Sequence, residues 1–272
     1  MISLMYWYLF PISIIIATLA MSTLVGGATF FSPLFILLLK LPPHIAIPAA
    51  LTTQFFGFTT GMIGYMKKKC IDYRTSFILL IITIPYALIG VYIGTKIDAF
   101  FIKILLGIIL IYIACSLYSH NKLSIRGKTH VEIHYQRNDK TIKMGAEDVK
   151  TNVVSTAIGS LFLGMTSAGL GEMLGFDWIN KSKASFKTLV SSTVFIIAIT
   201  TAITSLAYLI YLSNTDASSL KEVANILIFT IPGVIMGARW GVRLIHHIDQ
   251  KTMQIYISFI LFIAGILCFV PF

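Results

Sequence analysis

Residues 75–95 read TSFILLIITIPYALIGVYIGT, an apolar run without a single charged side chain. A helix of about 20 such residues spans the hydrocarbon core of a bilayer. The rest of the chain has the same character, because 57% of its 272 residues are hydrophobic and only 12% are charged. A soluble domain carries about 25% charged residues. The sequence therefore predicts an all-α, polytopic membrane protein and excludes a soluble enzyme.

Working outward from this run, we expect about eight full spans in all. They lie near 6–25, 46–66, 75–95, 99–118, 151–168, 184–212, 223–243 and 252–271. Two further apolar segments, 28–40 and 169–180, are too short to span a bilayer comfortably. Each follows a cluster of small residues, so we interpret both as half-helices hinged to the preceding segment.

The opening run contains a pattern that recurs in the second half of the chain. Residues 84–94 read IPYALIGVYIG and residues 231–241 read IPGVIMGARWG, so an Ile-Pro pair and two glycines return at the same spacing 147 residues later. A helix with a hydroxyl cluster precedes each copy, and an aspartate follows each copy. These features predict two tandem transmembrane repeats, 1–118 and 151–272, joined by a polar cytoplasmic linker over 119–150.

The distribution of Lys and Arg predicts that the two repeats are inverted. Cations accumulate in the cytoplasmic loops of membrane proteins. If each repeat crosses four times, 12 of the 21 cations lie on one side and 9 on the other; if the short segments also cross, the counts become 17 and 4. An odd number of crossings per repeat makes the repeats inverted. The linker then lies in the cytoplasm, and both termini lie outside the cell membrane.

The two short segments mark breaks that are typical of a transporter site. Hydrocarbon cannot satisfy free backbone groups, so a break persists only where it lines a cavity or contacts a ligand. The half-helix after a break presents unpaired N–H groups and the positive end of its dipole, which favour an anion. Close helix packing through small residues is the alternative. The predicted substrate-binding residues are Gly26, Gly27 and Ser32 at the first break and Ser167, Gly169 and Gly171 at the second.

Clusters of hydroxyl and amide side chains lie on the helices that follow the breaks. Such groups hydrogen-bond an oxyanion without carrying a charge of their own. Hydroxyls in membrane helices also bond back to the carbonyl four residues earlier, and this alternative stays open. The further candidates for substrate binding are Thr52, Thr53 and Gln54 in the first repeat and Ser191, Ser192 and Thr193 in the second.

Glu172 is the one carboxylate that lies clearly at membrane depth. An acid in that position is a functional hypothesis by default. We predict that Glu172 carries a coupling proton. Because it lies close to the start of a half-helix, a structural capping role is the alternative.

The sequence contains no cofactor or metal motif, since GxGxxG, P-loop and HExxH patterns are absent. The pair His130 and His134 in the linker is too weak a signal for a metal site. All six histidines fall in loops or at span ends, which argues against an intramembrane protease. We expect no catalytic residue, no cofactor, no metal and no nucleic-acid partner. The expected partners are a small anionic substrate and membrane lipid, and the sequence leaves a homo-oligomer open.

The chain resembles the sulfite exporter TauE/SafE family over nearly its whole length apart from the linker. The resemblance lies in a glycine break followed by a proline (Gly26-Gly27-x5-Pro33-Leu34), an Ala helix with paired hydroxyls, and a later Pro…Gly-x3-Gly helix. The sequence departs from the family pattern in Ala28-Thr29 and in Glu172, which no proline follows. The resemblance implies a permease of the cell membrane for small anions, often sulfite or organosulfonates.

These features together favour a secondary transporter that moves a small anion by alternating access with a proton gradient. The sequence also allows two other functions. One is an anion channel, and the other is a structural or assembly membrane protein that transports nothing.

Overall fold

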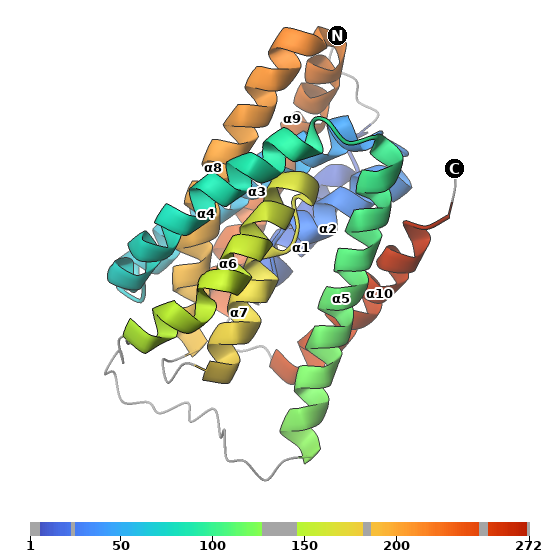
Figure 1. Ribbon diagram of the computed structural model, residues 1–272. Helices are drawn as coiled ribbons and strands as arrows, with labels where there is room; N and C mark the ends of the chain where they lie inside the picture. Colours follow the sequence, from blue (N-terminus) through green and yellow to red (C-terminus); the bar gives the residue numbers. More distant parts are fainter. Residues whose placement is uncertain (1–5, 23–24, 127–145, 182–185, 245–249, 271–272) are drawn as a thin grey trace.

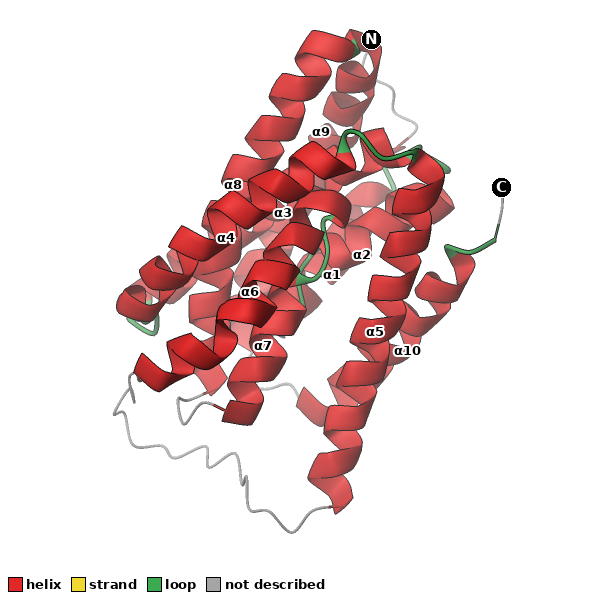
Figure 2. Cartoon of the chain, viewed as in Figure 1, coloured by secondary structure: helices red, strands yellow, loops and turns green. Residues whose placement is uncertain are grey.

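The computed structural model describes residues 6–22, 25–126, 146–181, 186–244 and 250–270 (Figure 1). All regular structure in these ranges is helical (Figure 2). His130, His134 and most of the predicted linker lie outside the described residues. The helices are α1 (Leu9–Ser22), α2 (Ala28–Pro33), the π-helical segment η2 (Leu34–Leu38), α3 (Pro43–Lys67), α4 (Tyr73–Gly94), α5 (Ala99–Arg126), α6 (Ala146–Thr166), α7 (Leu170–Lys181), α8 (Phe186–Thr215), α9 (Ala217–Leu244) and α10 (Gln250–Leu267).

Four helices within these ranges are long and apolar enough to cross a bilayer. They are α4, the Ala99–Ser119 part of α5, the Lys187–Thr215 part of α8, and α9. Shorter apolar helices cover Leu9–Met21, Ala28–Leu38, Val153–Thr166 and Met253–Leu267. The all-α, polytopic membrane fold is confirmed. The first span is shorter than expected, because α1 has 14 residues and is about 21 Å long.

The outer surface of the bundle is apolar and the interior contains many hydroxyl groups. Ile81 is 75% exposed and Tyr92 is 66% exposed on α4, and Tyr256 and Phe259 are similarly exposed on α10. A surface of this kind suits lipid and would aggregate in water. Buried hydroxyls occur throughout the interior, where they bond to helix carbonyls or to one another.

The repeated glycines allow two pairs of helices to pack at close range, α1 against α9 and α6 against α4. A Cβ atom on Gly237 would overlap with the carbonyl oxygen of Ile14, and one on Gly90 would overlap with the carbonyl oxygen of Leu161. Both members of the second contact move by 147 residues to give the first. Small residues that bring helix backbones together are common in membrane bundles.

Two buried hydrogen bonds between threonines repeat with the same offset. Thr53 on α3 bonds to Thr230 on α9 at 2.9 Å. Thr200 on α8 bonds to Thr83 on α4 at 3.1 Å. Adding 147 to the first and second residue numbers of the pair Thr53 and Thr83 gives Thr200 and Thr230. This relation makes Thr200 the counterpart of Thr53, whereas the sequence pattern suggested Ser192.

Two buried tyrosines make the same bond in corresponding helices. The Tyr65 hydroxyl donates to the Met21 carbonyl and the Tyr208 hydroxyl donates to the Gly164 carbonyl, each at 2.8 Å and each 44 residues upstream. In both cases, a long helix is tied to the C-terminal part of the helix before the break. The helices around the two breaks are therefore held by equivalent contacts.

The ends of the helices lie at two opposite sides of the molecule (Figure 1). The turn between α3 and α4, the end of α5 and the start of α6 lie at the lower end in this view. The turns that join α4 to α5 and α8 to α9 lie at the upper end. The connection between α6 and α7 lies inside the bundle instead, and α7 runs back toward the lower end (Figure 2).

Candidate functional site

The first break lies between α1 and α2. α2 has only six residues, all of them buried, and it begins directly after Gly26 and Gly27. Its last residue, Pro33, has no N–H to donate, and a proline ring crowds the carbonyl of the preceding turn. The helix widens immediately after Pro33 into η2, where the Leu39 N–H bonds to the Leu34 carbonyl five residues earlier. π-Helical turns of this kind occur frequently at functional sites.

The second break is a tight chain reversal between α6 and α7. Ser167 has φ +67° and Gly169 has φ +116°. Positive φ is uncommon for serine and routine for glycine, so Gly169 suits its place and Ser167 is held there by its surroundings. The Ser167 N–H still bonds to Leu163, at 2.8 Å, and closes the last turn of α6. Gly171 lies buried in the first turn of α7.

Glu172 joins the two breaks. Its Oε1 accepts a hydrogen bond from the Gly26 N–H at 2.9 Å and another from the Thr29 hydroxyl at 2.5 Å. Its Oε2 accepts from the Gly169 N–H at 3.1 Å, which is the capping interaction of a glutamate in the first turn of a helix. The side chain is 1% exposed. One buried carboxylate therefore satisfies backbone donors that lie 143 residues apart in the chain.

A second contact links the breaks directly, since the hydroxyls of Ser32 and Ser167 are hydrogen-bonded to each other. The Ser167 hydroxyl also contacts the Thr166 carbonyl. The structure thus brings together most of the residues predicted at the breaks, with Gly27 at the start of α2 beside them. The breaks that the sequence placed far apart meet inside the bundle.

Four of the six hydroxyl and amide candidates bind other parts of the protein. Thr52 donates to the Pro48 carbonyl at 2.7 Å, and Thr53 pairs with Thr230 as described above. The Ser191 hydroxyl donates to the Cys70 carbonyl at 2.8 Å. The Ser192 hydroxyl accepts from the Asp72 N–H at 3.0 Å. These side chains hold helices and the α3–α4 turn in place.

Gln54 and Thr193 differ from the other four candidates. The Oε1 atom of Gln54 and the hydroxyl of Thr193 are buried and have no hydrogen-bond partner among the described residues. Buried polar atoms are nearly always paired with protein, water or a ligand. Gln54 lies beside the first break, because a Cβ on Gly26 would be 3.2 Å from its Nε2.

Sequence reasoning missed Thr29, which makes the shortest bond to Glu172 of those given above. The signal was present, since Thr29 follows the double glycine and lies in the first turn of a helix. Its partner lies 143 residues away, so no local pattern identified the contact.

A model of the sulfite exporter TauE/SafE family matches residues 9–268. The chain belongs to this family. It is therefore a membrane protein of a transporter family and not an enzyme. The TauE/SafE match includes both breaks, Glu172 and all ten helices, with the outermost residues of the chain left over.

One curated relative has a similar length. The TauE/SafE chain is 21% identical over 247 residues to the "Probable membrane transporter protein YunE" of Bacillus subtilis (strain 168). The alignment covers 89% of this chain and 86% of that protein. No solved structure matches the chain significantly.

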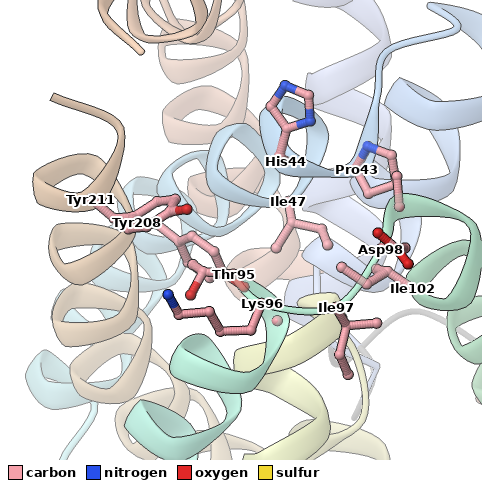
Figure 3. A pocket seen from close by; sticks show the side chains of 12 residues that line it. Pro43, His44, Ile47, Thr95, Lys96, Ile97, Asp98, Ile102, Tyr208 and Tyr211 are labelled. Atoms are coloured by element: carbon pink, nitrogen blue, oxygen red, sulfur yellow. The ribbon is translucent and has the colours of Figure 1, made fainter. Parts of the chain in front are cut away.

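A pocket of about 300 Å³ opens at the end of the TauE/SafE protein where α4 leads into α5. The start of α3 and the last turns of α8 complete its lining. Figure 3 shows Lys96 extending toward the side formed by Tyr208 and Tyr211, whereas Asp98 lies at the opposite side beside Pro43. The Lys96 ammonium and the Asp98 carboxylate are thus kept apart within one opening.

Three cations gather at the other end of the same helices. The Lys68 ammonium donates to the Val242 carbonyl at 2.8 Å, near the last turn of α9. Partial burial, followed by the nearby Lys187 and Arg243, lowers the pKa of Lys68. A lysine near the end of a helix also suits the negative end of the helix dipole.

Proposed function

We propose that the chain is a secondary transporter that moves a small anion, sulfite or an organosulfonate, across the cell membrane by proton-coupled alternating access. The observation that carries the proposal is the hydrogen bonding of both breaks to one buried carboxylate. Backbone N–H groups from two breaks converge on a negative group, so the same donors suit a substrate anion. The TauE/SafE family and its relative YunE support transport as the activity.

The position of Glu172 suggests how a proton and an anion are coupled. In its ionised form, Glu172 fills the place that the breaks offer to an anion. A second negative charge beside it is strongly disfavoured in a buried site. Protonation removes the charge and frees donors at Gly26, Thr29 and Gly169. The anion and the proton then move together.

The substrate-binding residues of this proposal are those at the breaks, with Gln54 and Thr193 as the additional polar contacts. Gly26, Gly27, Gly169 and Gly171 leave the backbone accessible, and Ser32 and Ser167 supply hydroxyls. Thr52, Thr53, Ser191 and Ser192 already have protein partners, so we assign them to packing.

The same proposal includes two inverted repeats, 1–118 and 151–272, joined by a cytoplasmic linker at 119–150. It is supported by the contacts that recur at an offset of 147 and by the turns at opposite ends of the bundle. In inverted repeats, two equivalent halves take turns in closing one side of a central site. Two re-entrant pairs, α1 with α2 and α6 with α7, complete five membrane segments in each half.

Transport by the purified protein in liposomes tests the function. The panel contains sulfite, thiosulfate, taurine, sulfoacetate and small carboxylates under an imposed pH gradient. We expect saturable, concentrative flux of one sulfur oxyanion and its loss in Glu172→Gln. Flux that survives this substitution contradicts the proton role of Glu172. Unsaturable flux identifies a channel, and the absence of any flux favours a protein without transport activity.

Cysteine labelling tests the topology. Cys115 is exposed and is first replaced by serine. Cysteines at Lys69 and Lys187 are expected to react with an impermeant reagent from the same side, and cysteines at Lys96 and Lys221 from the other side. Labelling of Lys69→Cys and Lys187→Cys from opposite sides contradicts the inverted arrangement.

A further inference from the structure

Gln54 has a buried amide oxygen without a partner. The residue is 2% exposed, and its Oε1 finds no hydrogen-bond donor among the described residues. Most buried polar atoms in native proteins are paired, and an exception calls for a physical reason. One reason is that the atom is paired in another state of the protein.

The Gln54 amide lies across from the Glu172 carboxylate, at a spot that Gly26 leaves empty. A Cβ on Gly26 would be 3.2 Å from Gln54 Nε2, 3.4 Å from Thr29 Oγ1 and 3.5 Å from Glu172 Oε1. Because glycine has no Cβ, these three groups face a common space. An alanine at position 26 would fill it.

The groups now bonded to Glu172 suit its ionised form only. A carboxylate accepts hydrogen bonds, whereas a protonated carboxyl also has one O–H to donate. The N–H groups of Gly26 and Gly169 cannot accept that proton. Gln54 has both a donor and an acceptor at its tip, and a half-turn of the amide about its last torsion exchanges the two. It can therefore serve either form of the acid.

The charge state of Glu172 is the variable in this region of the described structure. The groups that influence its carboxyl are Thr29, Gly26, Gly169 and its own backbone. Neither α2 nor η2 carries a titratable side chain, and the described side chains of α6 include none. The titratable groups described on α3 and α8 lie near the helix ends: His44, Tyr65 and Lys67 on α3, and Lys187, Tyr208 and Tyr211 on α8.

We propose that Gln54 is the positioning residue for the protonated form of Glu172. When the carboxylate takes up one proton from one side of the membrane, its new O–H turns to Gln54 Oε1. The N–H groups of Gly26 and Gly169 are then free to bind the transported anion. When the proton leaves on the other side, the carboxylate returns to these N–H groups and the anion is released. No other bond forms or breaks. The inference rests on the proposed function for its transport step only.

Infrared difference spectroscopy of the purified protein tests the hydrogen bond without a substrate. A spectrum at acidic pH minus one at neutral pH is expected to show the carbonyl stretch of a protonated carboxyl, which Glu172→Gln removes. In Gln54→Met, a substitution of similar volume, this band moves to higher frequency because the O–H has lost its acceptor. The same band position in wild type and Gln54→Met overturns the proposal, and so does a spectrum without a Glu172 band.

Sulfite uptake into liposomes under a pH gradient tests the transport step. Gln54→Met is expected to raise the KM for sulfite about tenfold and to weaken its dependence on the pH gradient. Thr156→Val is the matched control, since Thr156 is also buried without a partner for its hydroxyl but lies on α6, and its uptake is expected to equal that of wild type. If Gln54→Met folds poorly, Gln54→Leu and Gln54→Asn take its place, with Gln54→Asn expected to keep partial coupling. Wild-type uptake that Gln54 variants leave unchanged contradicts the inference. An absence of sulfite uptake in wild type contradicts the proposed function, while the infrared result still decides the role of Gln54.

Discussion

At the scale of single residues, the site depends on backbone conformations that few side chains tolerate. Gly169 at φ +116° turns the chain so that its N–H and the Glu172 carboxylate meet. Ser167 takes a left-handed conformation next to it, and the hydroxyl bond to Ser32 holds it there. Strain of this kind concentrates at functional sites, where the surrounding structure maintains it.

The Gly169→Ala variant is expected to unfold at a lower temperature, with a free energy of unfolding reduced by roughly 1–3 kcal/mol, because a Cβ is strained at its φ. Lys69 provides the opposite change. It has φ +52° without being glycine, so Lys69→Gly is expected to stabilise the protein by up to about 1 kcal/mol. Thermal unfolding in detergent, followed by circular dichroism, measures both. Equal midpoints for the two variants would contradict the argument from backbone strain.

At the scale of helices, the bundle depends on close contacts and on hydroxyls that fasten one element to the next. The pairs α1–α9 and α6–α4 touch backbone to backbone at glycines. The α3–α4 turn is fastened to α8 by Ser191 and Ser192. Packing and polar contacts take the place of a hydrophobic driving force between helices in lipid.

Substituting Gly237 tests the helix contact. In Gly237→Ala, the added Cβ meets the Ile14 carbonyl, which belongs to a backbone that cannot move aside, so we expect a loss of roughly 1–3 kcal/mol in unfolding free energy. Gly57→Ala is the matched control, because its Cβ meets only the Val234 side chain at 3.2 Å. Thermal unfolding of the two variants gives the comparison. A larger loss in Gly57→Ala than in Gly237→Ala would be incompatible with this packing.

Ser191 and Thr193 separate a fastening role from a binding role on the same helix. Ser191→Ala leaves the Cys70 carbonyl without its donor and is expected to lower the unfolding free energy by roughly 1–3 kcal/mol with little change in KM. Thr193→Val removes a hydroxyl that has no described partner, so we expect unchanged stability and a raised KM for the transported anion. Stability and uptake are measured on both variants. The reverse assignment of the two effects would contradict our division of the hydroxyl clusters.

The sequence predicted the elements better than it predicted their contacts. The apolar runs identified the helices, and the double glycine and Ser167–Gly171 marked both breaks, because these are local properties. The partners of Glu172 were out of reach, since Gly26 and Thr29 lie more than a hundred residues upstream. The hydroxyl pattern was misleading for the same reason. Thr53 and Ser192 look alike in sequence, but the first bonds across to α9 and the second bonds to a turn.

At the scale of the whole molecule, the two ends of the bundle present cations at the same helices. Lys96 reaches into the pocket at one end, and Lys68, Lys187 and Arg243 gather at the other. Lys96 and Arg243 are separated by 147 residues, the offset that relates the glycines. Positive groups at a mouth raise the local concentration of anions.

Lys96→Gln is expected to raise the KM roughly two- to fivefold for an anion added at the pocket end, and Arg243→Gln is expected to do so at the opposite end only. The effect is expected to shrink at high salt, because salt screens exposed charges. Lys221→Gln is the control, since it removes a cation from the pocket end outside the pocket. Uptake by liposomes with a known protein orientation measures each KM. Equal effects of Lys96→Gln from both ends would contradict the separate roles of the two mouths.

The bonds of Glu172 to Gly26 and Thr29 also affect how the protein is made. During synthesis, the first re-entrant hairpin enters the membrane long before residue 172 exists, so its free N–H groups must find water or temporary partners. When α7 follows, its carboxylate is too polar to enter lipid by itself. The two hairpins therefore complete each other's insertion. Assembly of the central site is a late step in biogenesis, and a chain that stops before residue 172 has no means of closing its first half.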